Sequence, residues 1–182
     1  MSNVKFYYEW LPLDKNDFRI LALLAGYGDF QGNFSDLCAA LSLSKSGKNN
    51  KSLQNSIERL QQESYIEAET KSEQIKLSIV PKENEIWIEK ERFAQIFCKK
   101  FITSVSWQNV LKVYLWINKN VTNELIHRAE IADAINVSNS SIISATNVLQ
   151  DELKFIVKET VITKNADDEY VTQGQYIEEG AF

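Results

Sequence analysis

The sequence predicts a mainly helical α+β protein built from two similar units, and three observations support this prediction. Residues 36–44 (DLCAALSLS) and 130–138 (EIADAINVS) share one pattern 94 residues apart: acidic, apolar, small, variable, Ala, apolar, polar, apolar, Ser. Each copy is followed by a polar-faced amphipathic segment and then by alternating apolar residues. Apolar residues make up 44% and aromatic residues 11% of the 182 residues, which is ample for packed cores.

The repeated pattern is typical of the second helix of a helix-turn-helix. It gives a short amphipathic helix, a tight exit on a buried apolar residue, and a Ser that can cap the next helix. We therefore expect two tandem winged helix-turn-helix units in a pseudo-twofold arrangement, like a dimer within one chain, with small β-hairpins and a central sheet. The expected divisions are a first unit with an N-terminal strand (1–81), a connecting strand and helix (82–104), a second unit (105–173) and an acidic tail (174–182).

The elements of the first unit follow from hydrophobic periodicity and punctuation. Helical spacing of apolar residues predicts helices, and alternation on both sides of a polar turn predicts a β-hairpin. Ser52 is expected to cap the third helix, and Asn33 or Ser35 the second. The expected elements are a strand (4–11), a helix from residue 16 or 17 to a Gly-rich end (26–29), a second helix (35–41), a third helix, and a hairpin (65–80).

The second unit repeats this order after Pro81. A short strand (86–88) and a helix from about residue 91 are expected to connect the two units. Ser106 and Ser138 are expected to cap the first and third helices of the second unit. Its expected elements are a helix from residue 106, a second helix (126–135), a third helix (138–153), and a hairpin from residue 155 with its turn at 164–168.

The two copies are not in one register throughout. Leu60-Gln61 corresponds to Leu149-Gln150 at an offset of 89 residues, against 94 for the second helices. We therefore expect five extra residues in the first copy, within 45–51. An insertion there would sit beside the recognition helix, where it could reach phosphates.

The distribution of charge neither favours nor excludes nucleic acid as a partner. The net charge is −5, but residues 165–182 hold five of the 25 acidic residues and no base, so the remaining chain has 20 of each sign. A neutral body can still present one basic face. No apolar run is long enough for a membrane span, and the N-terminus does not resemble an export signal, so we expect a cytoplasmic protein without a membrane partner.

The candidate DNA-binding groups belong to the two third helices and, in the first copy, to the basic turn that precedes the third helix. Lysines would neutralise phosphates, and Arg or Asn side chains would make bidentate contacts to base edges. The hairpin tips add Lys71 and Lys164 as candidate phosphate contacts. In the first copy the candidates are Lys45, Ser46, Lys48, Asn49, Asn50, Lys51, Ser52, Asn55 and Arg59; in the second they are Asn139, Ser140, Ser141, Ser144 and Asn147.

The sequence carries no pattern of an enzyme. His127 is the one histidine, and no Cys or second His stands at metal-ligand spacing from it. Phosphate-binding and nucleophile motifs are absent as well. We expect no catalytic residues, no metal and no cofactor, and we expect Cys38 and Cys98 to be buried, reduced thiols.

The two helix-turn-helix copies, the aromatic Phe6-Tyr7-Tyr8 opening and the Ser46-Gly47-Lys48-Asn49-Asn50 turn resemble small proteins of Gram-positive mobile elements. The chain is similar to the TraN-type double-stranded-DNA-binding proteins of conjugative plasmids, and more distantly to plasmid replication initiators. This resemblance implies sequence-specific duplex binding and a regulatory or accessory role in transfer, at the type IV secretion operon or the origin of transfer.

Two alternatives stay open at this point. A plasmid or phage replication initiator would melt or bend origin repeats, and a protein-interaction adaptor would dock a transfer or replication component without binding DNA. If both units bind DNA, one monomer would recognise two half-sites about 34 Å, or a multiple of it, apart.

Overall fold

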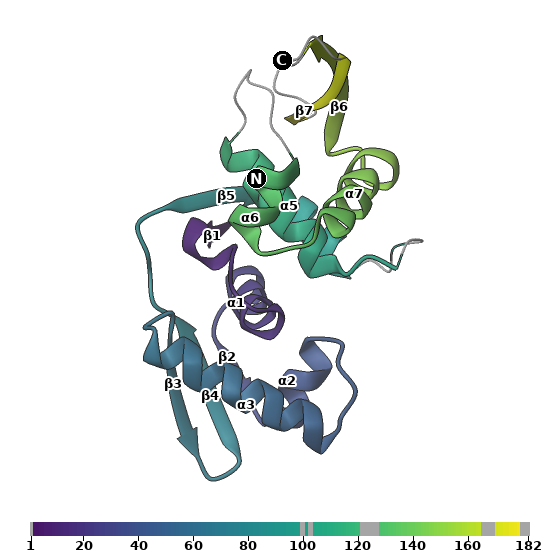
Figure 1. Ribbon diagram of the computed structural model, residues 1–182. Coiled ribbons are helices and arrows are strands. Elements are labelled where there is room, and N and C mark those ends of the chain that lie inside the picture. Colours follow the sequence, from purple (N-terminus) through teal and green to yellow (C-terminus); the bar gives the residue numbers. More distant parts are fainter. Residues whose placement is uncertain (1, 99–100, 102–103, 121–127, 165–169, 179–182) are drawn as a thin grey trace. The chain divides into compact units, whose positions relative to one another are not determined.

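The computed structural model describes residues 2–98, 101, 104–120, 128–164 and 170–178. The protein is α+β, with helices α1 to α7 and small sheets (Figure 1). Its internal contacts divide it into two compact parts, Met1–Lys90 and Glu91–Phe182, called unit 1 and unit 2 below. In the described residues, no helix combines the length and apolar character required to cross a bilayer.

Unit 1 contains the predicted order of three helices followed by a hairpin. A three-residue strand, which the Gly-rich sequence did not predict, lies between the first and second helices. The elements are β1 (Asn3–Tyr7), the 3-10 turn η1 (Tyr8–Trp10), α1 (Lys15–Tyr27), β2 (Phe30–Gly32), α2 (Phe34–Ala40), α3 (Gly47–Gln62), β3 (Ile66–Lys71), β4 (Gln74–Ile79) and β5 (Glu85–Glu89).

The strands of unit 1 form two separate sheets rather than part of one central sheet. In one, β1 pairs antiparallel with β5, so that Lys5 lies opposite Trp87. In the other, β4 lies between β2 and β3. The expected strand at 86–88 therefore belongs to unit 1, and the division of the chain falls after Lys90, inside the segment expected to connect the units. Apolar cross-strand pairs such as Val4 with Ile88 explain this pairing, because each strand alone has only one buried face.

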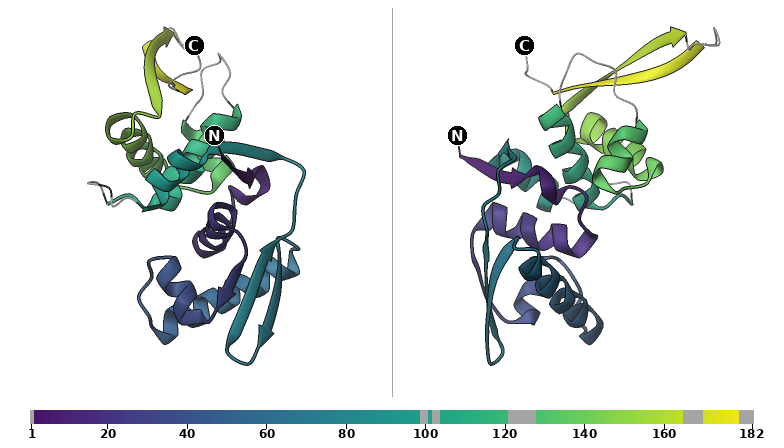
Figure 2. Two further views of the ribbon diagram at one scale, coloured as in Figure 1. Left: turned by 180° about the vertical axis from the view of Figure 1, so that it is seen from behind. Right: turned by 60° about the vertical axis from the view of Figure 1, so that its left-hand side comes forward.

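The core of unit 1 forms where α1, α2, α3 and the sheet β2-β4-β3 meet. Figures 1 and 2 show α3 alongside α1, with the β3–β4 hairpin beside α3. The inward residues of α3 fall at helical spacing, so one apolar stripe faces the core and the other face is left to solvent. The fully or almost fully buried side chains include Phe18, Leu21, Leu37, Leu53, Leu60 and Leu77.

The second helix of unit 1 is fixed at both ends by local hydrogen bonds. Asn33 accepts from the backbone N–H of Asp36 at 3.0 Å, and Asp36 accepts in return from the N–H of Asn33 at 3.0 Å, forming a capping box. At the other end Ser42 has a positive φ of 55°, and the N–H of Leu43 donates to the carbonyl of Cys38 at 2.8 Å. This exit is a Schellman motif, in which a left-handed residue satisfies the last carbonyls of the helix.

Unit 2 follows the same plan as far as its helices are described. Its core includes Leu111, Tyr114, Ile131, Ile142 and Leu149, all buried. The predicted helix at 126–135 is described from Arg128, because 121–127 lie outside the described residues. The elements are α4 (Lys90–Cys98), α5 (Trp107–Asn120), α6 (Arg128–Ile135), α7 (Asn139–Asn147), the π-helical turn η2 (Val148–Glu152), β6 (Ile156–Lys164) and β7 (Tyr170–Glu178).

The C-terminal hairpin corrects the expected acidic tail. Strand β7 continues to Glu178 and pairs antiparallel with β6 from Ile156↔Glu178 to Lys164↔Tyr170. Residues 174–178 are therefore part of a sheet, and only 179–182 lie outside the described strands. Residues 172–175 (TQGQ) show no alternation of apolar and polar side chains, which is why the composition suggested a tail.

The internal repeat is visible in the backbone as well as in the sequence. In unit 2, α6 also ends at a left-handed residue, Asn136 with φ of 52°, and the N–H of Val137 donates to the carbonyl of Ala132 at 3.1 Å. Ser42 and Asn136 occupy equivalent positions, 94 residues apart. The two copies thus share a left-handed residue after the second helix and the hydrogen bond made by the residue that follows it.

Candidate nucleic-acid interface

Helix α3 begins six residues earlier than the sequence predicted. Ser46, not Ser52, is its N-cap: the Ser46 backbone is extended and its hydroxyl accepts from the N–H of Asn49 at 3.2 Å. Ser52 lies inside the helix, and its hydroxyl accepts from the Asn16 side chain at 2.9 Å. The prediction failed because Gly, Asn and Lys in succession resemble a loop, whereas one good cap is enough to start the helix at Gly47.

Three exposed lysines therefore lie in and just before the first turns of a helix. Lys48 and Lys51 project from α3, three residues apart on one face, and Lys45 stands in the turn before the cap. Asn55 continues the same exposed face one turn further along. Two of the three predicted lysines, Lys48 and Lys51, thus lie on a helix rather than in a loop.

The position of these lysines costs helix stability. The N-terminus of a helix carries a partial positive charge, so cations in the first turn are unfavourable, and α3 has no acid there. Lys48 and Lys51 also repel each other at a spacing of three residues. An anion bound at this end would relieve both effects, and phosphate oxygens would additionally meet unpaired backbone N–H groups.

Arg59 is paired with an acidic residue of α1. Its guanidinium donates to both carboxylate oxygens of Asp17, at 2.7 and 3.1 Å, and to the hydroxyl of Ser56 at 3.3 Å. Asp17 is 4% exposed, and the hydrogen bond to Asp17 raises the pKa of Arg59 above its ordinary value. Arg59 thus joins α3 to α1, and its predicted contact with a base edge stays a prediction.

Several polar candidates of unit 1 are also engaged inside the structure. Asn49 donates through its side chain to the carbonyl and hydroxyl of Ser44, at 2.8 and 3.0 Å, which holds the turn before α3. Asn50 accepts from the buried thiol of Cys38 at 3.4 Å. Ser46 caps α3, and Ser52 accepts from Asn16. Together with Asn49 and Asn50, these serines stabilise α3 and the turn before it rather than offer contacts to a ligand. Ser46 and Arg59 are exposed but engaged in these contacts, and the other exposed candidates are Lys45, Lys48, Lys51 and Asn55.

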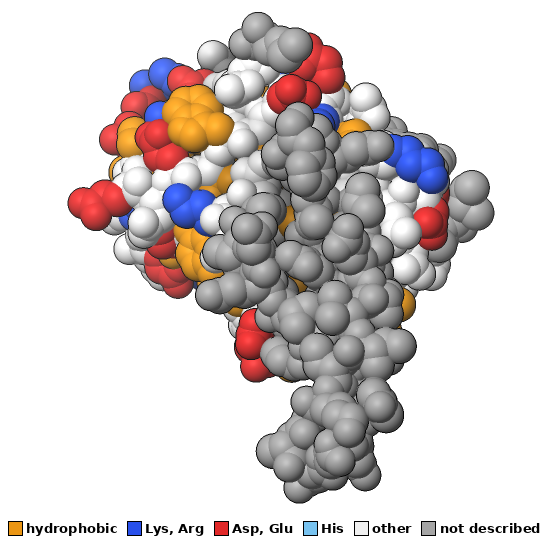
Figure 3. All heavy atoms as spheres, turned by 90° about the horizontal axis from the view of Figure 1, so that it is seen from above, with side chains coloured by type: hydrophobic (Ala, Val, Ile, Leu, Met, Phe, Trp, Pro, Cys, Tyr) orange, Lys and Arg blue, Asp and Glu red, His pale blue; other side chains and the backbone are white. Residues whose placement is uncertain are grey.

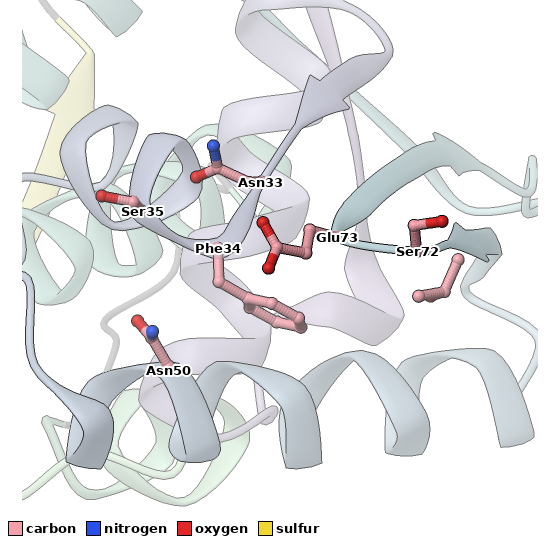
Figure 4. Close-up of a pocket in the computed structure, with 7 residues that line it drawn as sticks. Asn33, Phe34, Ser35, Asn50, Ser72 and Glu73 are labelled. Carbon is pink, nitrogen blue, oxygen red and sulfur yellow. The ribbon is translucent and has the colours of Figure 1, made fainter.

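A surface hollow of about 450 Å³ lies between α3, the start of α2 and the tip of the β3–β4 hairpin. Figure 4 shows the ring of Phe34 directed into it between Asn50 and Glu73. The carboxylate of Glu73 would repel a phosphate, so this hollow does not extend the lysine cluster. Its lining residues are Asn33, Phe34, Ser35, Asn50, Thr70, Ser72 and Glu73.

The hairpin tips give weak support to the predicted phosphate contacts. Lys71 is exposed at the end of β3, opposite Gln74. Exposed carboxylates precede and follow it, at Glu69 and Glu73, so this hairpin offers no net positive charge. Lys164 ends β6, and the placement of its side chain lies outside the described part of the structure.

The start of α7 in unit 2 is a network of serines. Ser138 caps the helix, as predicted, by accepting from the N–H of Ser141, and its hydroxyl lies 3.1 Å from Ser140 and 3.0 Å from Ser141. Ser144 donates to the carbonyl of Ser140 at 3.1 Å. The serine hydroxyls are thereby used locally.

The remaining candidates on α7 are Asn139 and Asn147, both exposed. Between them stands Ile143, 41% exposed, which sequence reasoning did not single out. The sequence did indicate this exposure: at the offset of 89 residues, Ile143 is the counterpart of Gln54, on the outer face of the third helix.

Cys38 is buried and reduced, as predicted, and burial raises the pKa of its thiol. The side chain of Cys98 and all of His127 lie outside the described residues. Within the part of the chain that the structure describes, no cluster of three or more His, Cys, Asp or Glu side chains could hold a metal ion.

On the face drawn in Figure 3, basic and acidic side chains are interspersed.

Comparison of the chain with protein-family models, with curated proteins and with solved structures gives no match.

Proposed function

We propose that this protein binds double-stranded DNA through two winged helix-turn-helix units, with unit 1 supplying the principal phosphate contacts. The observation that carries the proposal is the exposed face of α3, where Lys48, Lys51 and Asn55 line up after Lys45. In a helix-turn-helix, the N-terminal part of the corresponding helix enters the major groove. Lysines at this end suit phosphates, and Asn55 suits an adenine edge.

The order of elements supports the winged-helix assignment for unit 1. Helix α1, strand β2, helices α2 and α3, and strands β3 and β4 follow one another, and β2 pairs with β4. Strand β2, which lies between α1 and α2 in the chain, pairs with β4 at one edge of the sheet. The β3–β4 hairpin then corresponds to the wing. The matching exits of α2 and α6 extend the helix-turn-helix assignment to unit 2.

We further propose a regulatory or accessory role in conjugative plasmid transfer, at the secretion operon or the origin of transfer. This part rests on the resemblance of the sequence to TraN-type proteins. Chromatin immunoprecipitation in a host that carries the element would test it: enrichment at the origin of transfer or the operon promoter supports the role, and enrichment confined to a replication origin supports an initiator instead.

The salt dependence of DNA affinity tests the contact surface. Full-length protein would first enrich a binding site from a randomised duplex library, and fluorescence anisotropy would then give Kd across a salt series. Replacing Lys45, Lys48 and Lys51 by Ala should lower the magnitude of the slope of log K against log salt by about 2 to 3, since each phosphate contact contributes about 0.9.

A matched variant removes the same charge elsewhere in unit 1. Lys15, Lys76 and Lys90 are also exposed but lie outside α3 and its preceding turn. Their replacement by Ala should leave the slope unchanged. Equal slopes for the two triple variants would contradict the assignment of the phosphate contacts to α3.

The spacing of half-sites tests whether both units engage one duplex. Inserting about 5 base pairs, half a helical turn, between the enriched half-sites would rotate one of them to the opposite face of the DNA. We expect this insertion to weaken binding by tenfold or more, and an insertion of a full turn to weaken it less. Affinity that is indifferent to both insertions would show that one unit binds alone.

A further inference from the structure

We propose that unit 2 reads A·T base pairs through the exposed face of α7, with Ile143 packing against a thymine methyl group. This inference rests on the proposed DNA binding and adds to it a specificity-determining residue and the base pair that it recognises. Asn139 and Asn147, one turn before and one turn after Ile143, complete the face.

The register of the two recognition helices shows that Ile143 stands on the outer face. Four buried positions of α3 match four buried positions of the helix formed by α7 and η2 at one constant offset of 89 residues. At that offset Ile143 is the counterpart of the exposed Gln54, and Asn139 of Asn50. The matched buried pairs are Leu53 with Ile142, Ser56 with Ala145, Ile57 with Thr146, and Leu60 with Leu149.

Packing does not account for an isoleucine at this position. Ile142, the preceding residue, is fully buried, while Ile143 is 41% exposed. The carbonyl of Ile143 accepts from the hydroxyl of Thr146 at 3.0 Å, but this contact is independent of the side chain. Ile143 is therefore not part of the buried core, and 41% of its surface is open to solvent.

The surroundings of Ile143 favour DNA over a protein partner. Of the large hydrophobic residues exposed in the described structure, Ile143 is the one that belongs to unit 2, and its neighbours on the face are Asn and Ser. A stable protein interface buries about 800 Å² on each partner around a contiguous apolar centre. One isolated apolar residue suits a single methyl group instead.

The major groove offers such a group at thymine alone among the four unmodified bases. The thymine 5-methyl is read by apolar side chains, and Asn forms bidentate hydrogen bonds to N6 and N7 of adenine. An Ile between two Asn residues, each four positions away, therefore matches a run of A·T pairs. The absence of charge on the described outer face of α7 means that this unit adds sequence preference rather than salt-dependent affinity.

Replacing single thymines by uracil tests the proposed contact, because deoxyuridine pairs with adenine as thymidine does but lacks the 5-methyl group. The probe is the duplex that the full-length chain enriches from a randomised library, synthesised again with deoxyuridine at each thymine in turn. We expect wild-type protein to lose about fourfold in affinity at one or two positions of one half-site, the factor that corresponds to about 0.8 kcal/mol for one buried CH₂ group.

The variant Ile143→Gln copies the residue found in unit 1 and leaves the buried face intact. It should bind the thymine and uracil duplexes equally well, whereas Ile143→Val should retain the difference. The matched control Gln54→Ala changes the equivalent position of unit 1 and should also retain it. Circular dichroism would verify that the variants are folded.

Each other outcome overturns the inference in a recognisable way. Duplex binding that is insensitive to uracil, or equally sensitive in Ile143→Gln, removes the thymine contact while leaving DNA binding in place. A failure to bind any duplex removes the proposed function together with the inference. If Ile143→Gln leaves DNA affinity unchanged but abolishes self-association in analytical ultracentrifugation, the face is a protein interface.

Discussion

Arg59 on α3 and Asp17 on α1 form a two-pronged ion pair with donor–acceptor distances of 2.7 and 3.1 Å. The pair joins α3 to α1 across 42 positions of sequence. Because the guanidinium and the carboxylate are both planar, it fixes the rotation of α3 about its own axis as well as its position. The outward direction of Lys48, Lys51 and Asn55 depends on that rotation.

Replacing Arg59 by Ala should destabilise unit 1 rather than alter base preference. The change leaves the buried Asp17 carboxylate without its donors. We expect a loss of about 1–3 kcal/mol in the free energy of unfolding, limited by the partial exposure of Arg59 to solvent. Urea denaturation would measure it, with Arg59→Lys as a control that keeps the charge but loses the paired geometry. Unchanged stability together with altered sequence preference would return Arg59 to the DNA interface.

Replacing Lys48 by Glu should stabilise the protein while weakening DNA binding. Lys48 lies in the first turn of α3, where a negative side chain interacts favourably with the helix dipole. We expect a gain of about 0.3–1 kcal/mol in the free energy of unfolding, measured by urea denaturation at low salt. The same variant should bind the enriched duplex more weakly than wild type. A variant that is both less stable and unchanged in affinity would show that Lys48 serves the fold.

Cys38 should react slowly with alkylating reagents in the folded protein. Its thiol is buried and donates to Asn50, and burial raises the pKa of the thiol, which disfavours the reactive thiolate. In a Cys98→Ser background, the rate of iodoacetamide modification at pH 8 should rise by at least tenfold when urea unfolds the chain. Equal rates in the two states would mean that α2 opens readily from α3.

The Lys5–Glu85 pair should make stability depend on pH in the acidic range. Lys5 donates to Glu85 at 2.6 Å between β1 and β5, and this hydrogen bond lowers the pKa of Glu85 below its ordinary value of 4.5. A lowered carboxyl pKa stabilises the folded state above the ordinary value, and this contribution is lost as the pH falls through the folded value.

The variant Glu85→Gln isolates that contribution. Wild type should exceed the variant in urea midpoint at pH 6, and the difference should disappear well below pH 4.5. The same hydrogen bond raises the pKa of Lys5, so the alkaline limit of the pair lies above the ordinary lysine value of 10.5. A difference that persists unchanged in acid would assign the effect to packing.

The parts of the fold that local sequence controls were predictable. The second helices, the tight turns that end them and the cap at Ser138 depend on residues within a few positions of one another. The five-residue register difference between the copies was also readable, because buried positions repeat at helical spacing. The structure locates part of the difference in the longer turn from Ser42 to Ser46, against Asn136 to Ser138, and the rest in extra residues at the start of α3.

The candidate site was predictable in position but not in detail. The lysines of residues 45–51 were found from composition, whereas the true start of α3 required the geometry of Ser46. The partners of Arg59, Asn49 and Asn50 come from other elements or from the turn, which no periodicity encodes. The exposure of Ile143 was not predicted either, although the register of the two copies pairs it with the exposed Gln54.

The sequence by itself determined the repeated helical plan, because amphipathic spacing, caps and left-handed exits are local properties of the chain. Tertiary structure alone decided which strands pair, such as β1 with β5, and which polar side chains of α3 remain available to a ligand. Pairing and availability both depend on contacts between residues far apart in sequence, whose free energies arise only once the helices and strands have packed.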